Sequence, residues 1–183
     1  MRRTIAGLVA TGLLTVGLAA PAAAQARGYV GFGGGISLPM GDFGDGAKSG
    51  VNGLVIAGIT GANGMLGGRI DGMYNRHSFE GTVDGSTQML GANLDLVVSP
   101  GSAAAKVRPY LLGGLGFFNI KTEVGTQEGE GETKLAFNLG GGLSLKAGSK
   151  MSLFLEARYI NIRTDVSSTA FVPISVGLRF GGN

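Results

Sequence analysis

The sequence contains no cysteine and a single histidine, His77. Without cysteine the chain forms no disulfide bond, so its fold depends on burial and on strand pairing. One histidine and no thiol also exclude a metal centre built from Cys and His ligands. The run Gly33-Gly34-Gly35 is not a dinucleotide loop, because no helix follows it. We therefore expect neither a metal ion nor a cofactor.

Charged residues are also scarce, at 15% of the chain, and the mean hydropathy is positive, +0.27. A soluble protein surface typically needs roughly 25 to 35% charged residues. Glycine is abundant instead, at 36 of the 183 residues. This composition argues against an ordinary water-exposed surface.

Residues 1–24 have the features of a secretory signal peptide. Two arginines precede an apolar run, Ile5–Ala20, and a small-residue stretch, Pro21–Ala24, which is the pattern of a cleaved leader. We expect cleavage before Gln25, with cleavage before Arg27 as the alternative. A membrane anchor is disfavoured, because the apolar run is short for the ~20 residues that a spanning helix needs.

The remaining segment, residues 25–183, is expected to form one domain. Removal of the leader takes two arginines from the 15 basic residues and leaves 13 against 12 acidic ones, a net charge of +1. The high isoelectric point therefore says nothing about nucleic acid, and we expect no nucleic-acid partner.

Apolar and polar residues alternate along most of this domain, which predicts an all-β fold. The C-terminal hairpin, Met151 to Phe180, shows it clearly, since Leu153 and Leu155 share one face while Glu156 and Arg158 share the other. We count eight strands, joined by connections that alternate between short and longer. The segment 50–60 is uniformly apolar, and its faces are not assigned. The predicted strands are 28–38, 50–60, 65–79, 87–98, 107–120, 134–146, 151–164 and 171–180.

The polar faces of these strands consist mainly of glycine, asparagine and serine. A soluble lipocalin-like barrel would alternate in the same way, with its apolar face turned inward, but such polar faces make a poor solvated surface. We therefore place the apolar faces against lipid and the polar faces in a crowded interior. In lipid every backbone N–H and C=O must be paired within the protein, so the sheet must close on itself. The expected fold is an eight-stranded antiparallel up-and-down transmembrane β-barrel, with short turns in the periplasm and longer loops outside.

Two stretches resemble a known family. The last strand ends on the outward aromatic Phe180, and a glycine-rich first strand is followed by Pro39-x-Gly41-Asp42-Phe43. Together with the leader and the eight strands, they resemble the eight-stranded OmpA/OmpX-like and opacity-like barrels of the Gram-negative outer membrane. The resemblance implies an outer-membrane location at the cell surface, contact with the lipid bilayer and lipopolysaccharide, and insertion by the outer-membrane assembly machinery. Its members serve as adhesins, as structural anchors or as lipid-modifying enzymes.

Charged residues on the predicted inner faces form the main candidate constellation. We expect them to pair as a polar core that stabilises the barrel, and a gated ion path is the alternative. If Thr164 and Phe171 flank the last connection as opposed residues, Glu156 lies opposite Arg179 and pairs with it. A slip of two residues would instead place Glu156 opposite Gly177 or Gly181. The six predicted core residues are Arg69, Asp71, Asp95, Glu156, Arg158 and Arg179.

Aromatic residues near the strand ends suit the girdles that flank the apolar band of a membrane barrel. His77 is expected at the outer rim. It cannot act with Ser78, because successive residues of a strand point to opposite faces, so we expect no catalytic site. The predicted girdle residues are Tyr74, Tyr110, Phe118, Tyr159 and Phe180.

We expect the two longest connections, Pro39–Ser49 and Lys121–Thr133, to be the functional loops. The second is rich in glutamate and glycine, which predicts a flexible solvated loop, and binding of a divalent cation is the alternative. We expect a structural or adhesive function carried by these two loops, with a surface ligand that the sequence does not identify. The alternatives are a small pore with a charged lumen and a lipid-modifying enzyme.

Overall fold

The computed structural model describes residues 26–80, 85–125, 127–163 and 168–181. The predicted leader, residues 1–24, lies outside this part. The described residues form eight long strands, one two-residue strand and a single 3-10 turn. None of them forms a helix long and apolar enough to cross a membrane. The elements are β1 (Arg27–Met40), η2 (Gly41–Phe43), β2 (Gly50–Thr60), β3 (Leu66–Ser78), β4 (Gly85–Val98), β5 (Val107–Val124), β6 (Gln127–Glu128), β7 (Glu132–Lys146), β8 (Met151–Arg163) and β9 (Ser168–Gly181).

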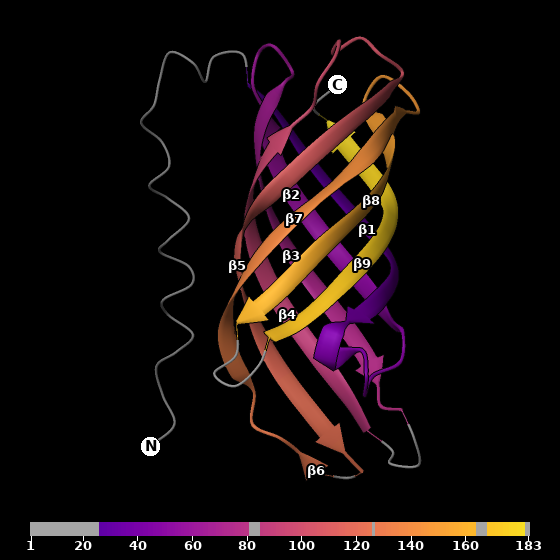
Figure 1. Cartoon of the computed structure of the whole chain (residues 1–183). Coiled ribbons are helices and arrows are strands. Elements are labelled where there is room, and N and C mark those ends of the chain that lie inside the picture. Colours follow the sequence, from indigo (N-terminus) through magenta and orange to yellow (C-terminus); the bar gives the residue numbers. More distant parts are fainter. Residues whose placement is uncertain (1–25, 81–84, 126, 164–167, 182–183) are drawn as a thin grey trace, which may run out of the picture.

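The eight long strands close into an antiparallel up-and-down barrel (Figure 1). Each pairs with the next long strand along the chain, and β1 closes the ring by pairing with β9 from Tyr29↔Gly181 to Met40↔Ala170. Closure gives each of the eight long strands a partner on both sides, which is the condition for a sheet in lipid. The predicted fold is therefore confirmed.

The apolar faces of the strands point outward. Val30, Val55, Leu94 and Leu139 expose 57 to 69% of their surface, which is the surface of a protein that meets lipid. The structure also settles the faces of β2, where Val51, Val55 and Ile59 point outward and Asn52, Leu54 and Ile56 inward.

The two ends of the barrel differ. One end, here called the turn end, carries the short β2–β3, β4–β5 and β7–β8 connections and the C-terminal end of β9. The other, the loop end, carries the β1–β2, β3–β4, β5–β7 and β8–β9 connections. The turn end is at the top of Figure 1, and the loop end, with η2 and β6, is at the bottom.

The segment Lys121–Thr133 differs from the predicted flexible loop. β5 continues to Val124, where it pairs with Gly85 of β4, and β6 pairs with the last two residues of β5. The alternation in Lys121-Thr122-Glu123-Val124 lets this stretch extend the barrel wall, because the N-terminal part of β4 offers it a free edge. The result is a hairpin of β5, β6 and β7 at the loop end (Figure 1).

The interior has two layers. A hydrophobic cluster occupies much of it, especially toward the loop end, and a polar network crosses its middle. The buried apolar members are Tyr29, Leu54, Ile56, Met73, Met89, Phe118, Ala136, Phe154, Ile160, Ile162 and Phe171.

Candidate functional site

Five of the six predicted core charges meet inside the barrel. Arg69 and Asp71 come from β3, Asp95 from β4, and Glu156 and Arg158 from β8; none of the five exposes more than 3% of its surface. Alternation places each of them on an inner face, where strands that are distant in sequence bring them together.

Arg69 joins opposite walls of the barrel. Its two terminal nitrogens lie 2.7 and 2.9 Å from the two carboxylate oxygens of Glu156, and its Nε lies 3.2 Å from Asp71 Oδ2. Three strands separate β3 from β8 in either direction around the ring, so this bidentate pair spans the lumen. The planar guanidinium matches a carboxylate in this two-bond geometry.

Arg158 contacts all three carboxylates. Its Nε donates to Glu156 Oε1 at 2.7 Å, its Nη2 to Asp71 Oδ2 at 2.8 Å and its Nη1 to Asp95 Oδ2 at 3.2 Å. The network thus joins two guanidinium groups to three carboxylates, which lets each buried charge find a partner.

Three neutral side chains complete the network. Asn93 Nδ2 donates to Asp71 at 2.9 Å, Asn138 Nδ2 to Asp95 at 2.8 Å, and the Tyr110 hydroxyl to Glu156 at 2.8 Å. Alternation places both asparagines on inner faces, although the sequence does not show which carboxylate each one meets.

Arg179 does not take part, so the predicted ion pair with Glu156 is wrong. In the structure Glu156 lies opposite Ser175, and Arg179 lies opposite Ser152. The prediction assumed a connection from 165 to 170, whereas β9 already begins at Ser168 and pairs with Arg163. The longer strand shifts the register by four residues and carries Arg179 to the turn end.

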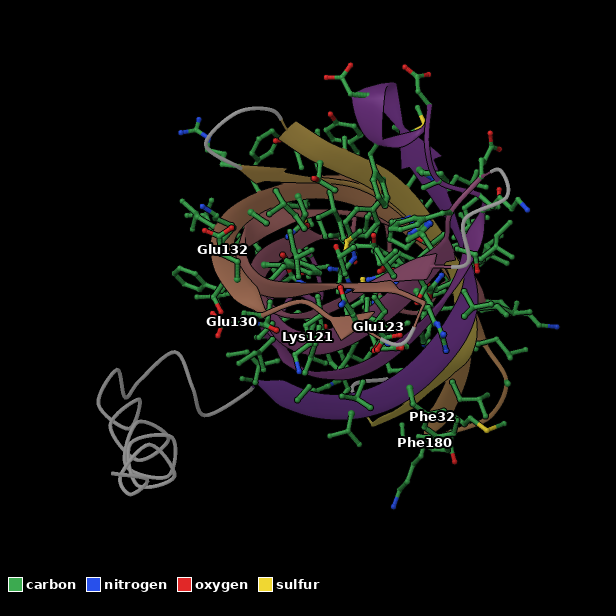
Figure 2. All side chains as sticks on the ribbon, turned by 90° about the horizontal axis from the view of Figure 1, so that it is seen from below. Phe32, Lys121, Glu123, Glu130, Glu132 and Phe180 are labelled. Carbon is green, nitrogen blue, oxygen red and sulfur yellow. The ribbon has the colours of Figure 1, made fainter. Side chains whose placement is uncertain are left out.

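The predicted girdle is also partly wrong. Tyr74, Tyr159 and Phe180 expose 38 to 40% of their surface on the outer wall, whereas Tyr110 and Phe118 expose 3% and 0%. Figure 2 shows Phe180 and Phe32 pointing away from the barrel, and their ring centroids lie 6.2 Å apart.

Glycines opposite the two buried aromatics explain their inward position. A Cβ at Gly91 would lie 2.4 Å from the Phe118 ring, and one at Gly142 would lie 2.6 Å from the Tyr110 hydroxyl. The missing side chains leave the space that these rings fill. Inner-face glycines are therefore the feature of the sequence that could have identified both rings as interior.

His77, predicted at the outer rim, lies next to the last residue of β3 at the loop end, where it is fully buried. The Phe43 ring covers it at 5.1 Å between centroids, and its Nδ1 lies 3.1 Å from the carbonyl oxygen of Lys48. Ser78 points to the opposite face. Within the described residues, no group of three or more His, Asp or Glu side chains could hold a metal ion.

The two predicted functional loops differ in structure. The β1–β2 connection folds back on the barrel, since Lys48 N donates to Ser78 O and Ala47 pairs with Phe79. Its Phe43 side chain also packs against the hydrophobic cluster of the interior. The β5–β7 hairpin instead presents its charges at the loop end, where Figure 2 labels Lys121, Glu123, Glu130 and Glu132.

Glu123 and Glu132 are held by neighbours. Gln88 Nε2 donates to Glu123 Oε1 at 2.7 Å, and Lys134 Nζ lies 2.7 Å from Glu132 Oε1. Glu130 is exposed. The hairpin is thus an ordered acidic surface.

Comparison with known proteins agrees with this architecture. The family model described as "Outer membrane protein beta-barrel domain" matches residues 8–180. No curated protein matched the sequence.

Three solved structures share the fold at low identity. Neisserial surface protein A is 18% identical over 84% of this chain and 96% of its own, with a TM-score of 0.65. Ail, the attachment invasion locus protein of Yersinia pestis, is 19% identical over 85% and 99%, with a TM-score of 0.55, and a second structure of Ail holds the heparin analogue sucrose octasulfate. OprG from Pseudomonas aeruginosa is 15% identical over 86% and 95%, with a TM-score of 0.55.

Proposed function

Because the chain belongs to the outer membrane protein β-barrel domain family, we propose that it is a surface-binding protein of the bacterial outer membrane. Its barrel is the anchor, and the hairpin of β5, β6 and β7 is the binding element. The loop end faces outward in this proposal, because barrels of this architecture keep short turns in the periplasm and longer loops outside.

The observation that carries the proposal is the blocked lumen. The Arg69–Glu156 pair bridges opposite walls, and both side chains are almost completely buried. A barrel of eight strands is just wide enough to be filled by its own side chains. This supports an anchor over the alternative of a small pore, which would require these buried pairs to separate.

The covered histidine disfavours the other alternative, a lipid-modifying enzyme. His77 lies beneath Phe43, and its one polar contact in the described residues is the carbonyl oxygen of Lys48. A general base needs a nucleophile or a substrate proton within hydrogen-bond reach.

The loop end carries an excess of negative charge, which indicates the chemistry of its ligand. The four segments around it contain nine acidic and five basic residues. The proposed ligand is therefore a protein or glycoconjugate with a basic surface. A sulfated ligand such as the one bound to Ail would meet like charge here. These segments are 41–49, 76–87, 121–134 and 163–167.

A binding assay with two probes of opposite charge tests the proposal. The protein, reconstituted in nanodiscs, is passed over polylysine and over heparin. We expect binding to polylysine alone. The triple variant Glu123→Gln, Glu130→Gln and Glu132→Gln should weaken it by roughly tenfold, because each surface charge pair contributes about 0.2 to 1 kcal/mol.

The matched control removes two acidic residues from the docked first loop, Asp42→Asn and Asp45→Asn, and should leave binding nearly unchanged. Equal losses in the two variants would show that general charge, not the hairpin, attracts the probe. Binding to heparin alone, or steady conductance in a planar bilayer, would contradict the proposed function.

A further inference from the structure

The turn end of the barrel concentrates positive charge. By sequence, no acidic residue occurs in 26–40, 46–70, 96–122, 133–155 or 166–183, and the strand ends and connections at the turn end all fall within these segments. Six basic residues lie at this end, and the nearest acidic side chains in the described part of the chain belong to the internal network. These residues are Arg27, Lys106, Arg108, Lys146, Lys150 and Arg179.

Three of these cations line one small cavity inside the mouth of the barrel. Arg108 comes from β5, Lys146 from β7 and Arg179 from β9, and no acidic residue lines the cavity. Its volume is about 30 Å³, which suffices for on the order of two water molecules or one small oxyanion.

Several buried polar atoms at this end lack a partner in the described part of the chain. They include Nε and Nη2 of Arg179, Nε of Arg108 and the Ser152 hydroxyl. Ser152 lies opposite both Lys146 and Arg179 in the strand ladders, so this hydroxyl sits between two cations. Buried donors of charged groups are costly to leave unpaired.

The remaining contacts of these cations hold them in place. The Arg179 guanidinium lies over the Tyr29 ring at 4.5 Å and over the Tyr110 ring at 5.4 Å. Arg108 Nη2 donates to the carbonyl oxygen of Gly64, and Lys146 Nζ donates to that of Ala103 at 2.9 Å. Each cation is thus oriented by a neutral group, and none of the three has a counter-ion among the residues that the structure describes.

We propose that this cavity binds a tetrahedral oxyanion of the phosphate class, held by Arg108, Arg179 and Lys146. Guanidinium groups offer paired N–H donors that match phosphate oxygens, and an ammonium adds a point charge. The anion comes either from free phosphate or from a phospholipid headgroup at the membrane surface. This site lies at the opposite end of the barrel from the proposed surface-binding hairpin, so each proposal can be tested independently of the other.

The test is a titration of the folded protein in the non-ionic detergent octyl glucoside, followed by NMR of the arginine Nε–H groups. Inorganic phosphate is added at constant ionic strength against chloride. We expect saturable shifts of the Arg108 and Arg179 resonances with phosphate and none with chloride. A second titration with short-chain phosphatidylglycerol identifies the source, since the lipid acts at lower concentration if the headgroup is the ligand.

Two variants test whether phosphate binding is specific to this cavity. Arg179→Gln should raise the dissociation constant at least about tenfold, because it removes hydrogen bonds to a charged group. Lys150→Gln, at the same end but outside the cavity lining, should change it less than about twofold. A difference in electrophoretic mobility between unheated and heated samples verifies that each variant is folded, and Arg108→Gln replaces Arg179→Gln if the latter is not.

Two results would overturn the proposal and leave water as the partner of these groups. One is chemical shifts that do not saturate with either phosphate or chloride, and the other is an equal rise of the dissociation constant in Lys150→Gln and Arg179→Gln. The wild-type titration decides the matter even if both cavity variants fail to fold.

Discussion

At the scale of single residues, stability rests on contacts across the lumen. The network holds two guanidinium groups and three carboxylates away from water, and each charge depends on the others. Removing one member of a buried pair costs more than the pair itself contributes, because the partner is left stranded.

We therefore expect Arg69→Gln or Glu156→Gln to lower the free energy of unfolding by about 3 to 5 kcal/mol. The double variant should cost less than the sum of the two, since both changes remove the same interaction. Urea unfolding in detergent or lipid vesicles measures these values. The cycle of Glu156→Gln with Arg179→Gln should show a much smaller coupling, because these two residues form no ion pair and share only Tyr110 as a neighbour. A coupling as large as that of the Arg69 cycle would support the pair that the observed register rejects.

Glycine on an inner face provides a second test. Gly142 faces the Tyr110 hydroxyl, so Gly142→Ala should overfill the interior and disturb the bond from Tyr110 to Glu156. We expect a loss of about 1 to 3 kcal/mol. Gly72 points outward, and the nearest atom to an added Cβ is a Val55 methyl group at 3.5 Å. Gly72→Ala should therefore change stability by no more than about 0.5 kcal/mol, and equal losses would refute the packing argument.

At the scale of elements, the register of the last hairpin decides which residues meet. Leu155 pairs with Val176 on the outer face, whereas the register expected from the sequence would place Leu155 opposite Phe180. A shift of this kind keeps every side chain on its own face, because it is an even number of residues. The alternation alone therefore cannot distinguish the two registers.

The absence of native cysteine makes this register easy to test. Leu155→Cys with Val176→Cys should form a disulfide readily under mild oxidation, because paired positions lie within bonding distance. Leu155→Cys with Phe180→Cys, four residues away, should stay reduced. Mass spectrometry after alkylation of free thiols separates the two outcomes, and a disulfide in the second variant would favour the expected register instead.

At the scale of the whole molecule, the barrel has an interior filled by side chains and an apolar exterior. The ion pairs cross the middle of the lumen, and the rings of Phe43, His77 and Phe171 pack edge to face toward its loop end. Because both layers fill the lumen with side chains, we expect them to block the passage of hydrated solutes.

We expect the reconstituted protein to show no steady conductance near the nanosiemens scale of wide porins, whose lumen stays open. Planar-bilayer recording measures this directly, with a wide porin as the positive control. Steady open-channel currents from the wild-type protein would show that the buried pairs separate under an applied voltage.

The sequence alone determined the architecture. Period-two alternation, scarce charge and glycine-rich inner faces admit one solution, because apolar strands in lipid must pair all their backbone groups by closing. Alternation also placed Arg69, Asp71, Asp95, Glu156 and Arg158 in the interior, since the face of a residue depends only on its parity along the strand.

Only the tertiary structure decided which of these charges meet. Besides its strand neighbour Arg158, Glu156 meets Arg69 on the opposite wall, and that second contact depends on strand tilt and stagger around the whole ring. The exclusion of Arg179 depended on where β9 begins, and the inward position of Phe118 on the space left by Gly91. Each of these cases depends on how one strand is placed against another, and periodicity within one strand does not fix its register with a second strand.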